Sequence, residues 1–133
     1  MMEEKRGGRF KVLCVDDSPV SLNLTKRTLE VGGYEVIAAQ DGPEGLEKAR
    51  QERPDAIILD IDMPGMDGFE VCQRLKEEPT TRQIPVIMLT ATQDKKLTEK
   101  AFALGAVSCL TKPFRGEHLT NLVRLVLVSK RKG

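Results

Sequence analysis

A chain of 133 residues is long enough for one domain with its own hydrophobic core, and no linker divides it. Charged residues make up 31% of the chain, but 21 basic and 20 acidic side chains leave a net charge of +1, which argues against binding nucleic acid through charge alone. No apolar run approaches the roughly 20 residues of a membrane span, and the charged start lacks a signal-peptide pattern, so we expect a cytoplasmic protein with no membrane partner.

The three cysteines, Cys14, Cys72 and Cys109, are an odd number, and each lies inside an apolar segment. None belongs to a CxxC motif or to a cluster with the single histidine, so a thiolate metal site is the weaker interpretation. We expect reduced cysteines in the protein core, as is usual in a reducing compartment.

Apolar runs of strand length alternate with amphipathic segments along the chain. Pro19 suits the first turn of a helix, and Asp41 and Glu44 have the spacing of a capping box. We therefore predict strands over residues 10–15, 34–39, 56–59, 85–89 and 107–110, with helices over residues 19–31, 41–53, 68–78, 95–104 and 117–128. A charged leader, residues 1–9, precedes them, and a basic tail, residues 129–133, follows as the solvated end of the last helix.

This alternation predicts a single α/β domain over residues 10–128. The run over residues 56–59 is apolar throughout, which is typical of a strand buried on both faces of a parallel sheet. With right-handed crossovers, five strands and five helices give a doubly wound, three-layer (βα)5 fold whose five-stranded parallel sheet has the order 2-1-3-4-5.

The strand over residues 56–59 ends on a carboxylate, Asp60, and the chain then turns at Pro64 and Gly65. An aspartate that caps a strand is common, so Asp60 alone indicates little. In open parallel sheets, however, ligands bind just beyond the carboxyl ends of the strands. Asp60 would lie at that edge, so the residues at the ends of the other strands decide its interpretation.

Polar residues follow four of the five predicted strands. They are Asp16 and Asp17 after the first, Asp60 after the third, Thr90 after the fourth and Lys112 after the fifth. Each alone is explained by helix capping, a strand end or a turn. Because these strands are neighbours in the predicted sheet, their side chains would converge on one edge, which favours a binding site.

These side chains are suited to bind a metal ion and an oxyanion. Three clustered carboxylates repel each other, and a hard cation such as Mg²⁺ relieves that repulsion with carboxylate oxygens, water and a phosphate oxygen as ligands. Lys112 offers a positive point charge and Thr90 a hydroxyl, both suited to a tetrahedral oxyanion.

From residue 10 to residue 128 the chain resembles a receiver domain of a two-component response regulator, with a CheY-like, flavodoxin-like fold. The motifs are Asp16–Asp17, Asp60 followed by Met63–Pro64 and Met66–Asp67–Gly68, Thr90–Ala91, and Lys112–Pro113–Phe114. The resemblance implies a signalling domain, not an enzyme: Asp60 accepts a phosphoryl group from a histidine kinase or a histidine phosphotransfer protein, and partner binding changes.

The resemblance also implies roles for the other residues. Asp17 would bind Mg²⁺ directly, Asp16 largely through water, and Asp62 through its backbone carbonyl. Thr90 and Lys112 would bind phosphoryl oxygens. The Lys112–Pro113 bond would be cis, which is found in roughly 5% of X–Pro bonds. The family's output face, made by the fourth helix, fifth strand and fifth helix, would bind an unknown target or form a phosphorylation-dependent homodimer.

Three alternatives remain at this stage. The chain is either a stand-alone receiver or a piece of a longer regulator or hybrid kinase. Asp60 and Asp62 also match the start of the D-x-D motif of haloacid-dehalogenase-type phosphatases, but Pro64 departs from that motif and no cap domain is present. An inert receiver-like module is the third interpretation, and the complete set of charged residues argues against it.

The first helix suggests a docking contact. Val20, Leu24 and Val31 share one face, whereas Leu22 and Leu29 point the opposite way. Chance exposure of the two leucines is a sufficient explanation, because scattered surface leucines are common. Since this helix docks the phosphodonor in the family, our hypothesis is that Leu22 is part of that contact.

Two further positions depart from the family pattern. Asp62 places a fourth carboxylate where many receivers have a neutral residue, so we expect its side chain to tune the lifetime of the phosphoryl group. Cys109 replaces the Tyr or Phe at the switch position, so the readout would rest on residues 91–104 or be weak, unless Phe102 or Phe114 compensates. His118, the single histidine, is expected to face solvent without a role.

Overall fold

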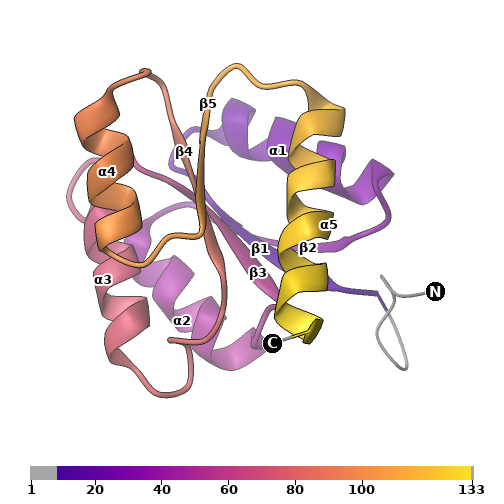
Figure 1. Ribbon diagram of the computed structural model, residues 1–133, viewed down its shortest axis with the longest axis horizontal. Coiled ribbons are helices and arrows are strands. Elements are labelled where there is room, and N and C mark those ends of the chain that lie inside the picture. Colours follow the sequence, from indigo (N-terminus) through magenta and orange to yellow (C-terminus); the bar gives the residue numbers. More distant parts are fainter. Residues whose placement is uncertain (1–8, 133) are drawn as a thin grey trace.

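The computed structural model describes residues 9–132, and side chains within them up to Ser129. Five parallel strands form one sheet in the order β2-β1-β3-β4-β5, which confirms the predicted topology (Figure 1). The strands are β1 (Lys11–Val15), β2 (Glu35–Ala39), β3 (Ala56–Asp60), β4 (Val86–Thr90) and β5 (Ser108–Thr111).

The helices that connect the strands are α1 (Pro19–Val31), α2 (Gly42–Glu52), α3 (Gly68–Glu77), α4 (Lys95–Ala103) and α5 (Gly116–Lys132). Four of them begin at the side chain of a capping residue, which accepts a hydrogen bond from a backbone N–H of the first turn; the caps are Ser18, Asp41, Asp67 and Asp94. Each bound lies within a residue or two of its prediction except the end of α5. That helix continues four residues past the predicted end at Val128, through residues assigned to the basic tail.

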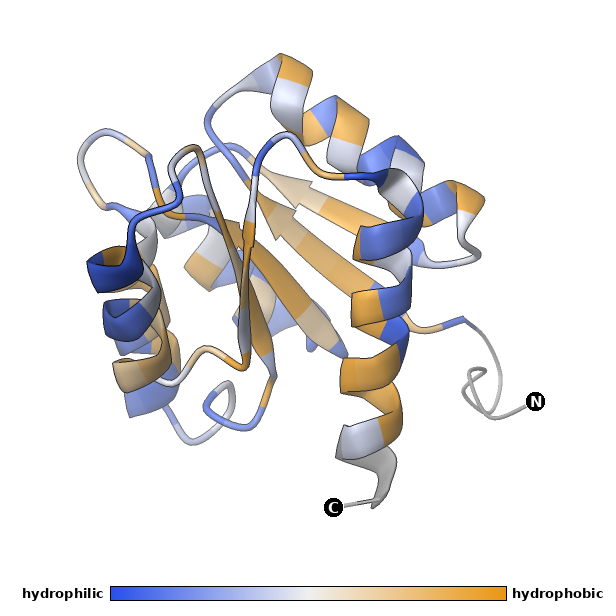
Figure 2. Ribbon diagram, turned by 45° about the horizontal axis from the view of Figure 1, so that its top comes forward, coloured by the Kyte–Doolittle hydropathy of each residue, from blue (hydrophilic) through white to orange (hydrophobic). Residues whose placement is uncertain are grey.

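Helices cover both faces of the sheet. One hydrophobic cluster joins one sheet face to α2, α3 and α4, and a second joins the other face to α1 and α5 (Figure 1). β3 and β4 are buried along their whole length, as their apolar sequences predict (Figure 2). Within the described residues, no helix is long and apolar enough to cross a membrane.

The predicted orientation of α1 is wrong. Leu22 and Leu29 are buried in the cluster under α1 and α5, whereas Val20, Leu24 and Val31 are 81%, 62% and 89% exposed. Each of the two sets lies on its own face of the helix, so the periodicity of apolar residues could not decide which face is buried. Packing against the sheet selected the face with the leucines. Leu22 therefore cannot form the proposed surface contact.

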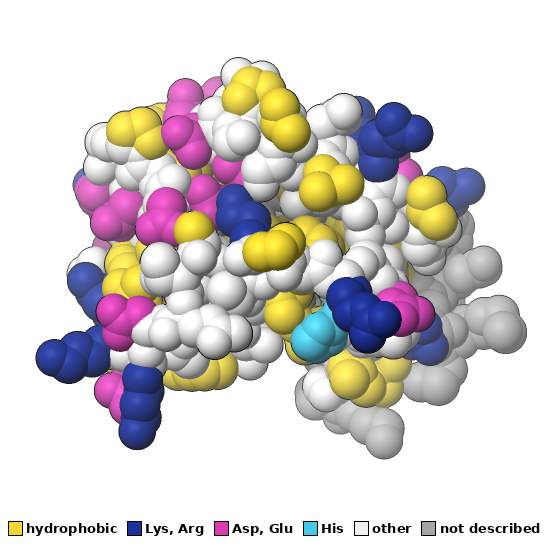
Figure 3. Space-filling model, turned by 90° about the horizontal axis from the view of Figure 1, so that it is seen from above, with side chains coloured by type: hydrophobic (Ala, Val, Ile, Leu, Met, Phe, Trp, Pro, Cys, Tyr) yellow, Lys and Arg dark blue, Asp and Glu magenta, His cyan; other side chains and the backbone are white. Residues whose placement is uncertain are grey.

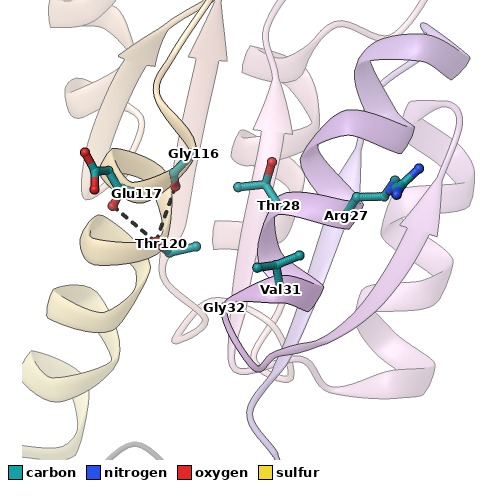
Figure 4. A pocket seen from close by; sticks show the side chains of 7 residues that line it. All are labelled: Arg27, Thr28, Val31, Gly32, Gly116, Glu117 and Thr120. Atoms are coloured by element: carbon teal, nitrogen blue, oxygen red, sulfur yellow. Dashed lines mark hydrogen bonds between the residues drawn. The ribbon is translucent and has the colours of Figure 1, made fainter.

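α1 and α5 approach each other closely through small residues (Figure 4). A Cβ added to Gly32 would lie 2.8 Å from Cγ2 of Thr120, and one added to Gly116 would lie 3.3 Å from Cγ2 of Thr28. The hydroxyls of Thr28 and Thr120 are bound to carbonyls of their own helices. A groove of about 430 Å³ lies over this contact, far along α1 from its first turn.

Candidate functional site

The predicted polar residues converge on the carboxyl-end edge of the sheet. Asp16 follows β1 directly, Asp60 and Thr90 are the last residues of β3 and β4, and Lys112 follows β5. Asp16, Asp60 and Thr90 are buried, Lys112 is half-buried and Asp17 is exposed. The face of the molecule at this edge carries acidic side chains gathered beside a basic one (Figure 3).

The loop after β3 gives Asp60 a fixed position. The N–H of Ile61 donates to the Leu89 carbonyl (2.8 Å), and the N–H of Gly68 donates to the Ile61 carbonyl (3.0 Å). A Cβ at Gly68 would collide with the Asp60 carbonyl and with Cα of Ile61 (2.7 Å). Glycine is therefore required at residue 68, where α3 starts directly against the end of β3.

Three carboxylates at this edge can hold a metal ion. Ligand oxygens of Asp16, Asp17 and Asp60 all lie within 4.8 Å of one another. Oδ1 of Asp16 accepts a hydrogen bond from the N–H of Ser18 (3.0 Å), which orients the carboxylate. Oxygen-only, acidic donors are those that Mg²⁺ and Ca²⁺ prefer.

Lys112 is the cation that faces these acids. Its Nζ donates hydrogen bonds to Asp16 Oδ2 (3.3 Å) and to Ser21 Oγ (3.0 Å), and lies 3.2 Å from Asp60 Oδ1. Burial disfavours the charged ammonium, but the negative charges of Asp60 and Asp16 outweigh burial and raise the pKa of Lys112. Lys112 therefore stays charged at physiological pH.

Asp60 has an unusual environment for a carboxylate. Burial, followed by the charge of Asp16, raises its pKa to about 6, while Lys112 acts in the opposite direction. Its Oδ1 is the buried side-chain oxygen that accepts no hydrogen bond from any residue the structure describes. Buried polar atoms are rarely left unpaired without a functional reason, so this oxygen marks the centre of the site.

Two further features lie at the ends of β4 and β5. Thr90 is buried, and its Oγ1 accepts a hydrogen bond from the N–H of Thr92 (3.3 Å). The N–H of Lys112 donates to the Thr90 carbonyl (2.7 Å), and the Lys112–Pro113 peptide bond is cis.

Asp62 lies at the mouth of the site, where it is exposed. Its Oδ2 accepts a hydrogen bond from the N–H of Ala91 (3.1 Å), which connects the loop after β3 to the loop after β4. Sequence reasoning had placed this carboxylate near the acceptor but had not found that it binds the backbone next to Thr90.

The sequence analysis missed Ser21. This residue lies in the first turn of α1, four positions after Asp17, so helical spacing would have placed it on the side of the acidic pair. A serine within a helix has many bland explanations, and only its contact with Lys112 distinguishes it.

Cys109 and His118 lie outside the pocket. Cys109 is half-buried and packs against the cluster under α2, α3 and α4; burial raises the pKa of its thiol, against a hydrogen bond from Thr98. Cys14 and Cys72 are buried and reduced, as expected. His118 is exposed.

A family model for the response regulator receiver domain matches residues 12–124. The chain belongs to this family. It is a signalling domain with a CheY-like fold rather than an enzyme.

Relatives of this receiver domain differ in how much of their length it covers. It is 45% identical over 103 residues to the response regulator PleD of Caulobacter vibrioides, which is 77% of this chain and 23% of PleD. It is 40% identical over 119 residues to the protein PilH of Pseudomonas aeruginosa, covering 88% of this chain and 97% of PilH. The chain spans 48% of several transcriptional regulators that it also matches.

Solved structures agree with the fold. The chemotaxis protein CheY4 of Vibrio cholerae superposes with a TM-score of 0.84 at 38% identity, covering 88% of this chain and 98% of CheY4. Over the matched part of the chain, the fold is that of a CheY-like receiver domain.

Proposed function

We propose that this receiver domain accepts a phosphoryl group on Asp60 in a Mg²⁺-dependent reaction and thereby changes its binding to other proteins. The observation that supports this proposal most strongly is the environment of Oδ1 of Asp60. It is buried, accepts no hydrogen bond from the described residues, and lies 3.2 Å from the Lys112 ammonium. A carboxylate oxygen with free lone pairs beside a cation is prepared for nucleophilic attack.

The residues fit a magnesium ion. Asp16, Asp17 and Asp60 offer carboxylate oxygens within 4.8 Å of one another. Burial first, and then the negative charge of Asp16, raises the pKa of Asp60, and a cation would relieve the repulsion between these carboxylates. Asp17 and Asp60 would bind the ion directly, Asp16 largely through water, and the Asp62 carbonyl would complete the set. When bound there, Mg²⁺ neutralises charge on the carboxylates and on phosphoryl oxygens.

The reaction follows from the positions of these side chains. A carboxylate oxygen of Asp60 attacks the phosphorus of a phosphohistidine in line, the new O–P bond forms as the P–N bond breaks, and the imidazole leaves with the bond's electron pair. Lys112 then faces the phosphoryl oxygens, and Thr90 can donate its hydroxyl to one of them after turning from Thr92. Little proton transfer is required, so positioning and charge supply most of the catalysis.

The phosphodonor would dock on the outer face of α1. Val20 and Leu24 are exposed there, and with Lys112, Pro113 and Phe114 they line a groove of about 390 Å³. This groove joins an apolar surface directly to the phosphoryl-binding lysine, as transfer from a histidine kinase or a phosphotransfer protein requires. Val20 and Leu24 replace Leu22 in the docking hypothesis.

The output would use the face made by α4, β5 and α5. Phe102 of α4, Val107 just before β5 and Leu125 of α5 are 49%, 48% and 65% exposed. Exposed large apolar side chains on three adjacent elements suit a protein partner or a phosphorylation-dependent homodimer. Phosphorylation would shift the population between two packings of this face.

Incubation with acetyl phosphate and Mg²⁺, followed by mass spectrometry, tests the proposal. We expect a gain of about 80 Da, the mass of one phosphoryl group, which is lost when Asp60 is replaced by asparagine. Turnover of acetyl phosphate without an adduct would favour the phosphatase interpretation. Absence of any reaction would favour the inert module.

A further inference from the structure

Strand β2 lies at one outer edge of the sheet. In a parallel strand, the N–H and C=O of one residue point to the same side, and alternate residues point to opposite sides. The N–H of Glu35 and the carbonyl of Ala39 are hydrogen-bonded to the residues that flank β1 (3.0 and 3.1 Å). The backbone groups of Val36, Ala38 and Gln40 therefore face outward, where a further strand would pair.

Two side chains of α2 bind these outward groups. Lys48 Nζ donates a hydrogen bond to the Ala38 carbonyl (2.7 Å), and the N–H of Gln40 donates to Glu44 Oε1 (2.8 Å). Lys48 Nζ also lies 3.1 Å from Glu44 Oε2, so the two side chains form an ion pair. The hydrogen bond from Gln40, followed by Lys48, lowers the pKa of Glu44, which keeps its carboxylate charged.

From these contacts we propose that the Glu44–Lys48 ion pair closes the outer edge of β2 against pairing with β2 of a second copy of the chain. An open edge strand presents unpaired N–H and C=O groups, and proteins protect such edges with charged side chains, lysine above all. A second copy fits this edge because one strand pairs with itself in antiparallel fashion across a twofold axis. The inference is independent of phosphorylation.

The covered groups are those that such a pair needs. In an antiparallel pair centred on Ala38, that residue faces its own copy, and Val36 faces Gln40. The central hydrogen bonds use the Ala38 carbonyl of both copies, and the flanking ones use the Gln40 N–H. Lys48 and Glu44 hold these groups, so the pair would keep only the bonds from the Val36 N–H to the Gln40 carbonyl.

The charges of the ion pair oppose the same association. The side chains of Lys48 and Glu44 are 35% and 39% exposed, so water still solvates both. A strand laid against β2 would displace this water and bring the ion pair of the second copy to the same interface. Burial of charged groups is unfavourable unless each gains a new partner, which this arrangement does not supply.

Sedimentation velocity over a range of protein concentrations tests the proposal. Glu44→Ala combined with Lys48→Ala should self-associate at least about tenfold more tightly than wild type, because several backbone hydrogen bonds become available. Glu44→Gln combined with Lys48→Arg keeps an acceptor and a donor and should behave like wild type. Glu47→Ala combined with Gln51→Ala is the matched control, since these residues of the same helix bind each other with the same spacing.

A proline on the strand tests where the copies meet. The Val36 N–H faces outward, so Val36→Pro removes no hydrogen bond to β1 and is tolerated at an edge. Added to the alanine pair, it should return self-association to the wild-type level. Lys48→Ala alone, which leaves the contact between Glu44 and Gln40 in place, should show a smaller increase and keeps the test valid if the alanine pair unfolds.

Hydrogen exchange gives a direct readout of the edge. At high concentration, the amides of Val36 and Ala38 should exchange about tenfold more slowly in the alanine pair than in wild type, because strand pairing protects them. Self-association no tighter than in wild type, association that Val36→Pro does not reverse, or unchanged exchange at Val36 and Ala38 would each overturn the proposal.

Discussion

Strand β3 has an aspartate at each end, and the two carboxylates have opposite environments. Asp55, directly before the strand, is 9% exposed and accepts a hydrogen bond from the N–H of Lys11 (2.8 Å). Asp60, at the other end, is 3% exposed, yet its Oδ1 accepts no hydrogen bond from the described residues and its pKa is raised to about 6. Burial alone therefore does not mark a reactive carboxylate; burial beside other carboxylates, with a raised pKa, does.

The two edges of the sheet differ in the same way. At the amino-end edge, Asp55 and Lys11 exchange backbone and side-chain hydrogen bonds, which join β1 to the start of β3. At the carboxyl-end edge, Asp16, Asp17 and Asp60 lie together, and Lys112 is the cation that faces them. The first edge joins two strands through paired hydrogen bonds, whereas the second gathers negative charge that can hold a metal ion.

Replacement of Asp60 gives the largest expected effect on chemistry. Asp60→Asn should abolish the phosphoryl adduct, because it removes the proposed nucleophile while keeping the side-chain volume. In EDTA at pH 7.5 it should also stabilise the protein by about 1–2 kcal/mol, measured by urea unfolding. A neighbouring aspartate phosphorylated at the wild-type rate would show that the acceptor has been assigned wrongly.

The sign of the stability effect follows from the raised pKa. Folded Asp60 titrates near 6, above its ordinary value of 3.8, so the folded state holds the proton more tightly than the unfolded state. The stability that this proton provides is complete below pH about 4 and is lost as the pH rises through 6. The advantage of Asp60→Asn over wild type should therefore shrink as the pH falls from 7 to 4. An advantage independent of pH would contradict the assigned pKa.

Asp55→Ala is the matched variant at the other end of the strand. Loss of its carboxylate leaves the N–H of Lys11 without that acceptor, so unfolding should require about 1–3 kcal/mol less free energy. Phosphorylation of the folded fraction should continue at the wild-type rate. If both aspartate variants changed stability and chemistry alike, the contrast between the two edges would be wrong.

Asp17 tests whether the acidic edge binds a metal. Asp17→Asn should weaken Mg²⁺ binding at least roughly tenfold, because it removes a charged ligand from a site with few of them. Isothermal titration with Mg²⁺ measures this directly. Asp41→Asn is a suitable control, since Asp41 is an exposed helix cap away from the three clustered carboxylates. Equal Mg²⁺ affinities for the two variants would argue against the site.

The outer face of α1 offers two exposed apolar residues to compare: Leu24, in the groove with Lys112, and Val31, in the groove at the other end of the helix. Leu24→Arg, in the groove that contains Lys112, should slow transfer from a cognate phosphodonor protein about tenfold and leave transfer from acetyl phosphate unchanged. Val31→Arg, in the groove over α5, is the matched control and should affect neither (Figure 4). Slower reaction of Leu24→Arg with both donors would indicate damage to the site instead of lost docking.

Asp62 should have a smaller effect. Its carboxylate holds the N–H of Ala91 at the mouth of the pocket, and its charge opposes a phosphoryl group beside it. Asp62→Asn keeps the size of the side chain and removes the charge, so the half-life of the aspartyl phosphate should change about two- to fivefold. An unchanged half-life would leave the Asp62 backbone carbonyl as its functional group.

The smallest expected effect concerns the readout at Cys109. A cysteine cannot fill and leave a ring-sized space, so a phosphoryl mimic such as beryllofluoride should change amide chemical shifts mainly over residues 91–104. Small changes around Cys109 would agree with this. A strong, concerted response at Cys109 and along α5 would show that the ring is dispensable.

The sequence by itself determined the order of the elements and the edge where the polar residues meet. Alternating apolar runs and helix caps predicted the five strands and five helices that the described residues form. β3 and β4 are buried on both faces, and in each of them the polar residue stands at the last position. Asp60 and Thr90 occupy those positions, so the site followed from the topology of parallel strands.

Only the tertiary structure decided how α1 is turned and what Lys112 contacts. α1 has apolar residues on two sides, and packing against the sheet and α5 selects the side that carries Leu22 and Leu29. That rotation buries Leu22, exposes Leu24 and brings Ser21 to Lys112, 91 positions away. Helical periodicity is a local property of the chain, whereas the direction of a hydrogen bond depends on where packing places two distant elements.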